Sequence, residues 1–288
     1  MAVGILTFNR AEPLRRALDS VLEQGIEPLE VIVADNGSTD GTAEMLARDY
    51  PHVKLIRIEQ NIGGPAGRNV IFQNCSSDYI INLDDDGYLA PDTIEKVREA
   101  FEADSEAGVI ALRQCFTDEP DKGRSFAEAG EEAVHFYEGV CAFRMAMLEE
   151  VGLYPQDFFH HHEALDLGIR ILDSRWKIIS RPDIIMWHPR LGGGSNADRT
   201  RWDFLRFRNY LYVVTRYYPA PLNLYWFARK SLLYLCYSLK RRTLTSWCRA
   251  MMAVLAGLPK AARYKKVRAE TVRRYYREMK RTERKHFS

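Results

Sequence analysis

The sequence predicts an α/β fold with a mainly parallel central sheet, followed by a C-terminal helical region. Three times in the first 75 residues, a short apolar strand is followed by a polar loop and an amphipathic helix. The last 50 residues carry 16 Lys and Arg against three Glu, whereas the other 238 carry 25 basic and 36 acidic residues. This charge separation indicates two regions of different function, which we divide into residues 1–190 and 191–288.

The first three predicted strands, residues 2–7, 29–34 and 53–58, each lead into a polar loop. The carboxyl ends of parallel strands meet along one edge of a sheet, where ligands bind. We therefore expect the polar side chains of these loops to gather there. They include Asn9, Arg10, Asp35, Asn36 and, after a glycine-rich turn, Arg68.

Three consecutive carboxylates, Asp84, Asp85 and Asp86, close a fourth apolar strand that begins at Tyr79. Adjacent anionic side chains repel one another unless a cation lies among them, and alternation along an extended chain aims Asp84 and Asp86 to one side. Hard oxygen ligands suit Mg²⁺ or Mn²⁺. The alternative interpretation is a solvated acidic turn.

Four of these segments together resemble the motifs of family 2 glycosyltransferases. The segments are Thr7-Phe8-Asn9-Arg10, residues 35–42, residues 63–69 and Leu83-Asp84-Asp85-Asp86. They occur in the order and at the spacing of the family, and the resemblance covers about residues 2–190. It implies a GT-A fold, which binds a nucleotide-diphospho-sugar, and sugar transfer with inversion at the anomeric carbon.

The resemblance also implies roles for single residues. Asp35 would accept a hydrogen bond from the pyrimidine ring, and Asp86 would be a direct metal ligand. Mg²⁺ or Mn²⁺ on the diphosphate would offset charge on the leaving nucleoside diphosphate. The residues expected to bind the nucleotide sugar are Thr7, Asn9, Arg10, Asp35, Asn36, Arg68, Asp84 and Asp85. The expected metal residues are Asp86, Asp84 and His188, with a structural imidazole as the alternative for His188.

A second cluster of chemically reactive residues follows Phe158. Glu163 and Asp166 are three residues apart and share one face of a predicted helix. An inverting transfer needs a carboxylate that takes the proton of the acceptor hydroxyl. The segment resembles the acid-rich catalytic helix of the family, but Ala164 replaces the acid that is commonly the base. We expect Glu163 to be the base, with Asp166 as the alternative, and a third alternative is that neither serves.

The three consecutive histidines, His160 to His162, do not predict a zinc site. Adjacent residues cannot all face one ion, and no Cys pair or suitably spaced His completes a tetrahedral set. We expect one of them to line the acceptor pocket and the others to be solvated or to cap the helix.

The loop from Pro189 to Asn196 contains Gly192, Gly193 and Gly194 and is a candidate lid over the donor. Beyond it, aromatic residues alternate with basic ones, which favours binding to an anionic membrane surface through amphipathic helices. The alternative is an ordinary helical subdomain with a solvated basic face. Nucleic-acid binding is not expected, because no such motif is present and the acidic part would repel a polyanion.

Other features concern location. The five cysteines are scattered, which indicates free thiols in a reducing compartment. The first strand begins at residue 2, so we expect no signal peptide, and no apolar run reaches the length of a transmembrane helix. We expect a cytoplasmic protein that binds peripherally to the inner face of the cell membrane.

The predicted function is a metal-dependent inverting hexosyl- or deoxyhexosyltransferase. It would use a nucleoside-diphosphate sugar and a saccharide or lipid-linked acceptor, in the synthesis of cell-surface polysaccharide or glycoconjugate. The alternative is a non-catalytic nucleotide-sugar-binding protein of the same fold that has lost its base at Ala164. A sugar-nucleotide pyrophosphorylase would need a basic glycine-rich loop near the N-terminus, and residues 4–9 do not provide one.

Overall fold

The computed structural model describes residues 1–27, 29–116, 119–124, 127–189 and 196–286. The strands are β1 (Ala2–Thr7), β2 (Glu30–Asp35), β3 (Lys54–Arg57), β4 (Tyr79–Asp84), β5 (Tyr88–Leu89), β6 (Ala107–Phe116), β7 (Glu119–Arg124), β8 (Glu132–Ala133), β9 (Val140–Arg144) and β10 (Lys177–His188). The helices are α1 (Ala11–Leu22), α2 (Thr42–Asp49), α3 (Gly64–Gln73), α4 (Thr93–Ala103), α5 (Met145–Val151), α6 (Glu163–Leu172), α7 (Asn196–Tyr217), α8 (Leu222–Arg241), α9 (Leu244–Ala261) and α10 (Ala269–His286).

Within the described ranges, the strands form one mixed sheet in the order β3-β2-β1-β4-β9-β6-β10-β5, with β7 on β6 and β8 on β10. Strands β1 to β4 pair in parallel, as do β6 and β10. Strand β9 lies antiparallel between β4 and β6. The predicted α/β class with a mainly parallel sheet is confirmed, and each of the first three strands lies within a residue or two of its predicted bounds.

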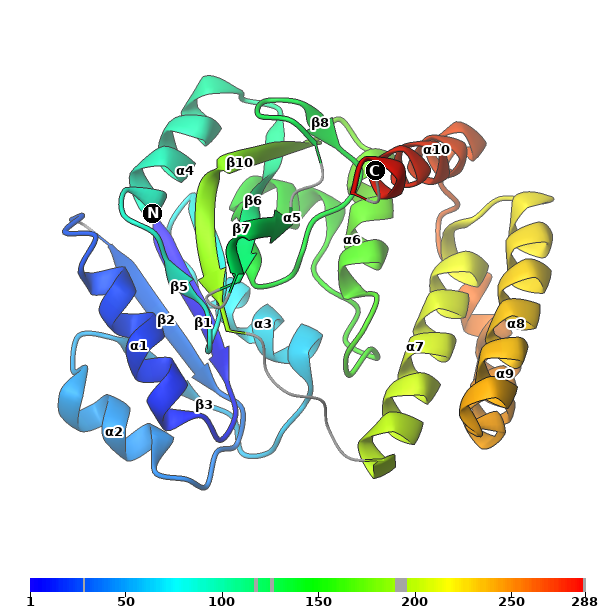
Figure 1. The fold of residues 1–288 in the computed structure, drawn as a ribbon, viewed down its shortest axis with the longest axis horizontal. Coiled ribbons are helices and arrows are strands. Elements are labelled where there is room, and N and C mark those ends of the chain that lie inside the picture. The colour runs from blue at the N-terminus through cyan, green and yellow to red at the C-terminus, as the bar shows by residue number, and fades with distance from the viewer. Residues whose placement is uncertain (28, 117–118, 125–126, 190–195, 287–288) are drawn as a thin grey trace.

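Helices cover both faces of the sheet (Figure 1), and an apolar core lies on each face. Side chains alternate between the two faces of a strand. In β2, Val31 and Val33 join the core formed with α1, α2 and α4, while Ile32 and Ala34 join the core formed with α3, α5 and α6. This two-sided burial explains why the strands read as continuous apolar runs in the sequence.

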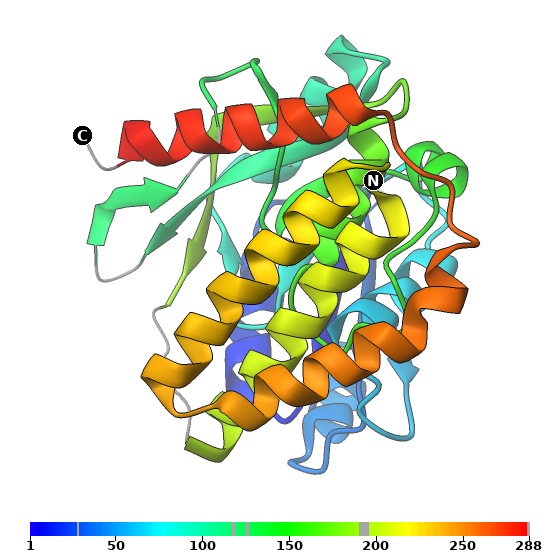
Figure 2. The ribbon, with the colours of Figure 1, turned by 90° about the vertical axis from the view of Figure 1, so that its right-hand side faces the viewer.

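The C-terminal helices pack against the sheet domain instead of forming a free basic tail. Figure 2 shows α7, α8 and α9 facing the viewer, with α10 (red) crossing above them. Helix α10 is tied to the sheet domain where Thr271 donates to Asp173 at 2.7 Å and Arg274 pairs with Glu132 at 2.7 Å. The glycines of the predicted lid, within residues 190–195, lie outside the described residues, and the division at residue 190 stays a prediction.

Asn69 of α3 holds the segment that leads into α6. Its side chain is buried, its Nδ2 donates to the Tyr154 carbonyl at 2.9 Å, and its Oδ1 accepts from the Tyr154 amide at 3.1 Å. One amide thus satisfies both backbone groups of a buried residue. Through this pair, α3 fixes the start of the stretch that carries His160 and Glu163.

We predict that Asn69→Ala lowers the free energy of unfolding by about 2–4 kcal/mol, because two buried backbone groups lose their partners. Urea unfolding would measure the change. The control is Asn74→Ala at the end of the same helix, where the exposed amide only donates to Val70 of the preceding turn. Equal losses in the two variants would contradict the anchoring role of Asn69.

Candidate active site

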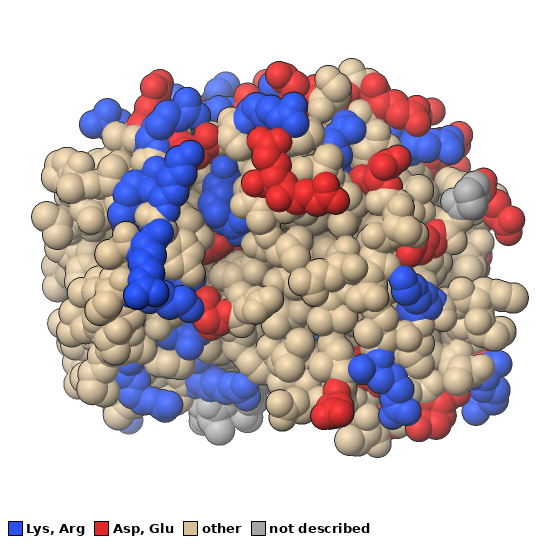
Figure 3. Space-filling view, turned by 180° about the vertical axis from the view of Figure 1, so that it is seen from behind, with Lys and Arg blue, Asp and Glu red and all other residues tan. Residues whose placement is uncertain are grey.

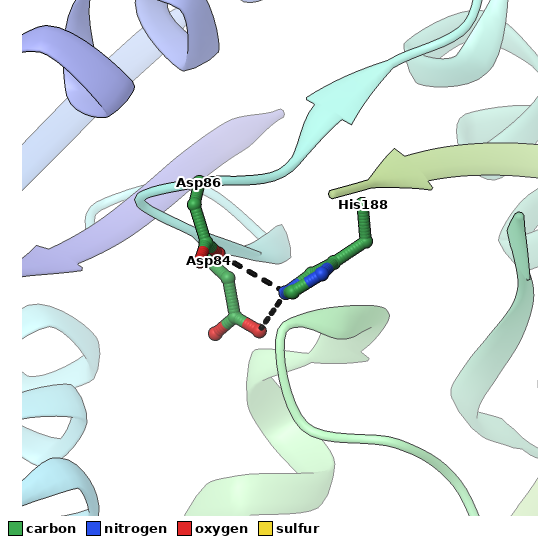
Figure 4. A group of neighbouring side chains, drawn as sticks. All are labelled: Asp84, Asp86 and His188. Carbon is green, nitrogen blue, oxygen red and sulfur yellow. Dashed lines mark ion pairs between the residues drawn. The ribbon is translucent and has the colours of Figure 1, made fainter. Parts of the chain in front are cut away.

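Asp84, Asp86 and His188 converge at the carboxyl ends of β4 and β10 (Figure 4). One ligand atom of each lies within 4.8 Å of the others. His188 Nε2 is 3.0 Å from Asp86 Oδ1 and 3.7 Å from Asp84 Oδ2. They meet because β5 follows the acidic turn directly and pairs with the end of β10, with Tyr88 opposite Trp187.

This donor set fits a divalent cation. Two carboxylates and an imidazole are ligands that Mn²⁺ accepts, and Mg²⁺ favours the carboxylates. The hydrogen bond with Asp86 and the charges of Asp86 and Asp84 raise the pKa of His188. The predicted pair Asp84 and Asp86 does face one side, together with His188.

Asp85 faces the other way, toward the end of β1. Thr7 Oγ1 donates to Asp85 Oδ2 at 3.0 Å. Arg10 Nη1 lies 3.2 Å from Asp85 Oδ1 and 2.6 Å from Asp86 Oδ2. Burial raises the pKa of Asp85 to about 6. Thr7, Arg10 and Asp85 therefore brace the acidic turn, and contact with a nucleotide sugar stays a prediction for each.

Asp35 and the two asparagines shape the loops at the ends of β1 and β2. Asp35 Oδ1 accepts from the Ser38 amide at 2.9 Å, and Asn9 Oδ1 accepts from the Thr39 amide at 2.7 Å. Asn36 Oδ1 accepts from the Ile62 amide at 3.0 Å. These bonds bring the three predicted loops together at one edge of the sheet.

Arg68 of α3 is 8% exposed and reaches two carboxylates. Its Nη2 lies 2.5 Å from Asp84 Oδ1, its Nε donates to Asn82 Oδ1 at 3.0 Å, and its Nη1 lies 3.6 Å from Glu138 Oε2. A guanidinium at this depth needs anionic partners, because an unpaired buried charge is costly. Arg68, which is expected to bind the nucleotide sugar, thus also holds Asp84 in place.

Glu163 and Asp166 lie on α6 but face different surroundings. Glu163 is 4% exposed, its Oε1 is 3.8 Å from His160 Nδ1, and its Oε2 has no hydrogen-bond partner in the described parts of the chain. Asp166 is fully buried and is held by Arg170 Nη2 at 2.8 Å and by the Tyr217 hydroxyl at 3.4 Å. Asp166 therefore joins α6 to α7. Of the two acids, Glu163 is the one whose charge acts on Arg68.

Glu138, in the segment before β9, lies next to Arg68 and is not among the site residues predicted from the sequence. Its side chain is 16% exposed, and neither carboxyl oxygen has a hydrogen-bond partner among the described residues. Burial, and then the neighbouring Glu163 carboxyl, raise its pKa well above the usual range. The only available signal was an acid directly before Gly139 and an apolar strand.

The three histidines line a cavity of about 180 Å³, formed by His135 to Glu138 and His160 to Leu165. His161 and His162 adopt left-handed backbone conformations, with φ of 72° and 66°. Burial lowers the pKa of each to about 3, so both rings are neutral. The expectation that the other histidines would be solvated or would cap the helix holds in part: His162 occupies the N-cap position of α6 without a side-chain cap bond, while Trp202 and Tyr210 pack edge-on against the half-buried His161 and His162.

We predict that His162→Asn makes stability less dependent on pH. Between pH 6.5 and about 3, the unfolded imidazole binds a proton that the folded one excludes, so the wild-type protein loses stability as the pH falls through this window. In the variant, the free energy of unfolding should change less with pH, by up to about 1.4 kcal/mol per pH unit. Asn is chosen because it tolerates the left-handed backbone.

Chemical denaturation from pH 7 to pH 4 would measure the slope. His52→Asn, at an exposed turn, should follow the wild-type curve. If the His162 variant also follows it, then the ring is not buried as a neutral group.

Comparison with known proteins agrees with this geometry. The family described as "Glycosyl transferase family 2" matches residues 2–151. The chain is 34% identical over 107 residues to a chondroitin synthase of Escherichia coli, and spans only 16% of that protein. It is 24% identical to the N-acetylglucosaminyl-diphospho-decaprenol L-rhamnosyltransferase of Mycobacterium tuberculosis, over 89% of this chain and 98% of that protein.

Two solved structures share the fold. TarS residues 1–349 of S. aureus superpose with a TM-score of 0.59 at 16% identity, covering 86% of this chain and 70% of that TarS segment. A mannosyltransferase of Pyrobaculum calidifontis, in complex with GDP-Man and Mn²⁺, gives 0.56 at 19% identity, covering 91% and 77%. The predicted GT-A fold is confirmed. Because the family match covers more than half of the 288 residues, the chain belongs to glycosyltransferase family 2.

Proposed function

We propose that this protein is an inverting glycosyltransferase that moves a hexosyl or deoxyhexosyl group from a nucleoside-diphosphate sugar to a saccharide or lipid-linked acceptor. The observation that carries the proposal is the convergence of Asp84, Asp86 and His188 beside Arg68 and the buried Glu163. Cation ligands and a carboxylate in one place are what this transfer needs. The expected setting is the synthesis of cell-surface polysaccharide or glycoconjugate.

The relatives support the substrate classes. The mycobacterial relative is named for transfer of L-rhamnose, a deoxyhexose, to a diphospho-decaprenol lipid. TarS has been solved with UDP and with UDP-GlcNAc, and the archaeal enzyme with GDP-Man. We infer a nucleoside-diphosphate donor from these likenesses, and a lipid-linked acceptor as the favoured one of the two.

Asp84, Asp86 and His188 would hold Mg²⁺ or Mn²⁺. When bound, the cation would neutralise the diphosphate and so stabilise the leaving nucleoside diphosphate. Arg68 would add a second positive charge, because a guanidinium binds phosphate oxygens in pairs. The loops that carry Asn9, Asp35 and Asn36 would contact the nucleoside, as the family pattern implies.

Glu163 is the proposed proton acceptor from the acceptor hydroxyl. Asp166, the alternative, is fully buried and its Oδ1 is held by Arg170 and Tyr217, while its Oδ2 has no partner in the described chain; its burial and its ion pair with Arg170 favour a positioning role for it. The second candidate function, a non-catalytic nucleotide-sugar binder, rests on Ala164, which stands where the family commonly has its base. Release of nucleoside diphosphate in the presence of acceptor separates the two functions.

We predict that Asp86→Asn weakens the Mn²⁺-dependent binding of a nucleoside diphosphate on the order of 10- to 100-fold and removes transfer, because a neutral amide is a poor cation ligand. Calorimetric titration of UDP and GDP, with and without Mn²⁺, would measure the affinity. Asp92→Asn is the control, because that carboxylate is 69% exposed and lies just past β5. Full transfer in the Asp86 variant, or by the wild-type protein in excess chelator, would refute the metal site.

We also propose that the outer surface of α8 and α9 binds an anionic membrane. From residue 204 to residue 269, the sequence holds 14 Lys and Arg and no Asp or Glu. Several large apolar side chains of these two helices are exposed by 41–69%: Leu224, Tyr225, Leu232, Leu233, Leu239, Leu244, Met252, Leu255 and Leu258. Seen from behind, Lys and Arg form a band on the side of the C-terminal helices, next to a broad uncharged surface (Figure 3).

A lipid surface fits this face better than a second copy of the chain. Two copies meeting through it would oppose one cationic surface to another, whereas each Lys or Arg near anionic lipid contributes about 1 kcal/mol. Among the helices of the described ranges, none has the length and apolarity to cross a bilayer, so the contact would be interfacial. Part of the aromatic set expected at the interface is packed inside instead, as where Trp226 stacks on Tyr276.

We predict that Leu232→Glu combined with Leu255→Glu weakens binding to phosphatidylglycerol vesicles by at least about 10-fold, since it adds two anionic groups to the membrane face. Vesicle co-sedimentation would measure this, and binding by the wild-type protein should fall at high salt. Leu22→Glu, at a leucine of α1 that is 50% exposed, is the control.

Equal pelleting of the wild-type protein with phosphatidylglycerol and phosphatidylcholine, or with neither, would refute the membrane surface. So would self-association without lipid that the paired leucine substitutions abolish, because the face would then be an interface between copies of this chain.

A further inference from the structure

We propose that Glu138 is a catalytic residue, which forms with Glu163 a carboxyl pair that receives the proton of the acceptor hydroxyl. The proposal deepens the function proposed above and rests on it. Glu138 would take over the role of the base that the family commonly has at the position of Ala164, from the segment that precedes β9.

Glu138 lies beside Arg68, close to the candidate metal residues. Its side chain is 16% exposed, its Oε2 lies 3.6 Å from Arg68 Nη1, and both carboxyl oxygens are buried without a hydrogen-bond donor among the described residues, so a hydrogen bond with the Glu163 carboxyl needs a proton on one of the two groups. The same guanidinium contacts Asp84 at 2.5 Å. Arg68 is the charged partner of Glu138, but no N–H or O–H group of the described residues donates a hydrogen bond to its carboxyl oxygens, whereas most buried polar groups have such a partner. Glu138 is therefore placed for a ligand, next to the candidate metal and diphosphate residues.

Glu138 and Glu163 line the same cavity. Glu138, Glu163 and Ala164 all line the cavity of about 180 Å³, which is several times the roughly 30 Å³ that one water occupies. The Glu163 Oε2 atom also lacks a hydrogen-bond partner in the described chain. Both carboxyl groups thus belong to residues that line a space large enough for a polar group of an acceptor. The methyl group of Ala164 offers no proton acceptor there.

Electrostatics support this use of the pair. Two adjacent carboxyl groups cannot both ionise easily, so such a pair holds one proton and retains one negative charge. Burial and the nearby Glu163 raise the pKa of Glu138 in this way, while the Arg68 charge opposes the rise. The pair therefore keeps one ionised carboxylate, which can receive the proton of the acceptor hydroxyl.

The step balances without any further reactant. The O–H bond of the acceptor breaks and its proton passes to the ionised carboxylate of the pair. The acceptor oxygen forms a bond to the anomeric carbon with its freed electron pair. The bond from that carbon to the phosphate oxygen breaks, and its electrons leave on the nucleoside diphosphate.

The test compares Glu138→Gln, Glu163→Gln and the wild-type chain at full length. Nucleoside-diphosphate release is measured with UDP-, GDP- and TDP-linked sugars, with saccharides and a membrane lipid extract as acceptors. Glu138→Gln should lower kcat by roughly 10²- to 10⁴-fold, the usual span for a general base, and leave the Kd for UDP or GDP with Mn²⁺ within about 2-fold. Glu106→Gln, an exposed acid paired with Lys177, is the control and should match the wild type.

A second variant guards against a merely structural effect. Ala164→Asp supplies a carboxylate from α6 to the same cavity, so Glu138→Gln with Ala164→Asp should regain at least about 10-fold of the lost kcat. No recovery together with lost nucleotide binding would show that Glu138 is structural and would overturn the proposal.

Two other results would also decide it. Full turnover by Glu138→Gln, in a preparation where the wild type is active, would overturn the role of Glu138 alone. A wild-type chain that binds UDP or GDP with Mn²⁺ but releases no nucleoside diphosphate from any donor would overturn this role and the proposed transferase function together.

Discussion

The active-site edge depends on the burial of one cation, the Arg68 guanidinium. It lies between Asp84 at the end of β4, Asn82 on the same strand, and Glu138 before β9. An unpaired guanidinium would be costly there, and so would either carboxylate without it. The three charges therefore have to come together when the sheet forms. Helix α3 is placed for this because it begins where the Gly64 amide donates to Phe159 at 2.9 Å, beside the segment that leads into α6.

The C-terminal helices matter to this site because they hold α6, which carries Glu163. Asp166 joins α6 to α7 through Tyr217, and Arg216 of α7 pairs with Asp157 just before the histidines. Helices α8 and α9 pack on α7, so the proposed membrane face and the proposed base belong to one packed unit.

Much of the site could be predicted because strand ends in a parallel sheet meet at one edge. That rule predicts from the sequence that the loops of Asn9, Asp35 and Arg68 lie together. The alternation of side chains similarly predicted that Asp84 and Asp86 face one side while Asp85 faces away. Glu138 could not be found in this manner, because a single acid in a segment without periodicity gives no signal. Asp166 shows a second limit: spacing by three residues predicts a shared helical face, but not which neighbour that face meets.

The sequence alone determined the fold class, the order of the ligand loops and the acidic strand end, because these follow from local patterns of apolar and polar residues. Tertiary structure decided which acids share a space. His188 joins Asp86 only because β5 pairs with β10, and Glu138 meets Glu163 only because β9 is inserted antiparallel between β4 and β6. Contacts between residues so distant in the chain depend on strand order and on the burial of charge, and no local pattern encodes either.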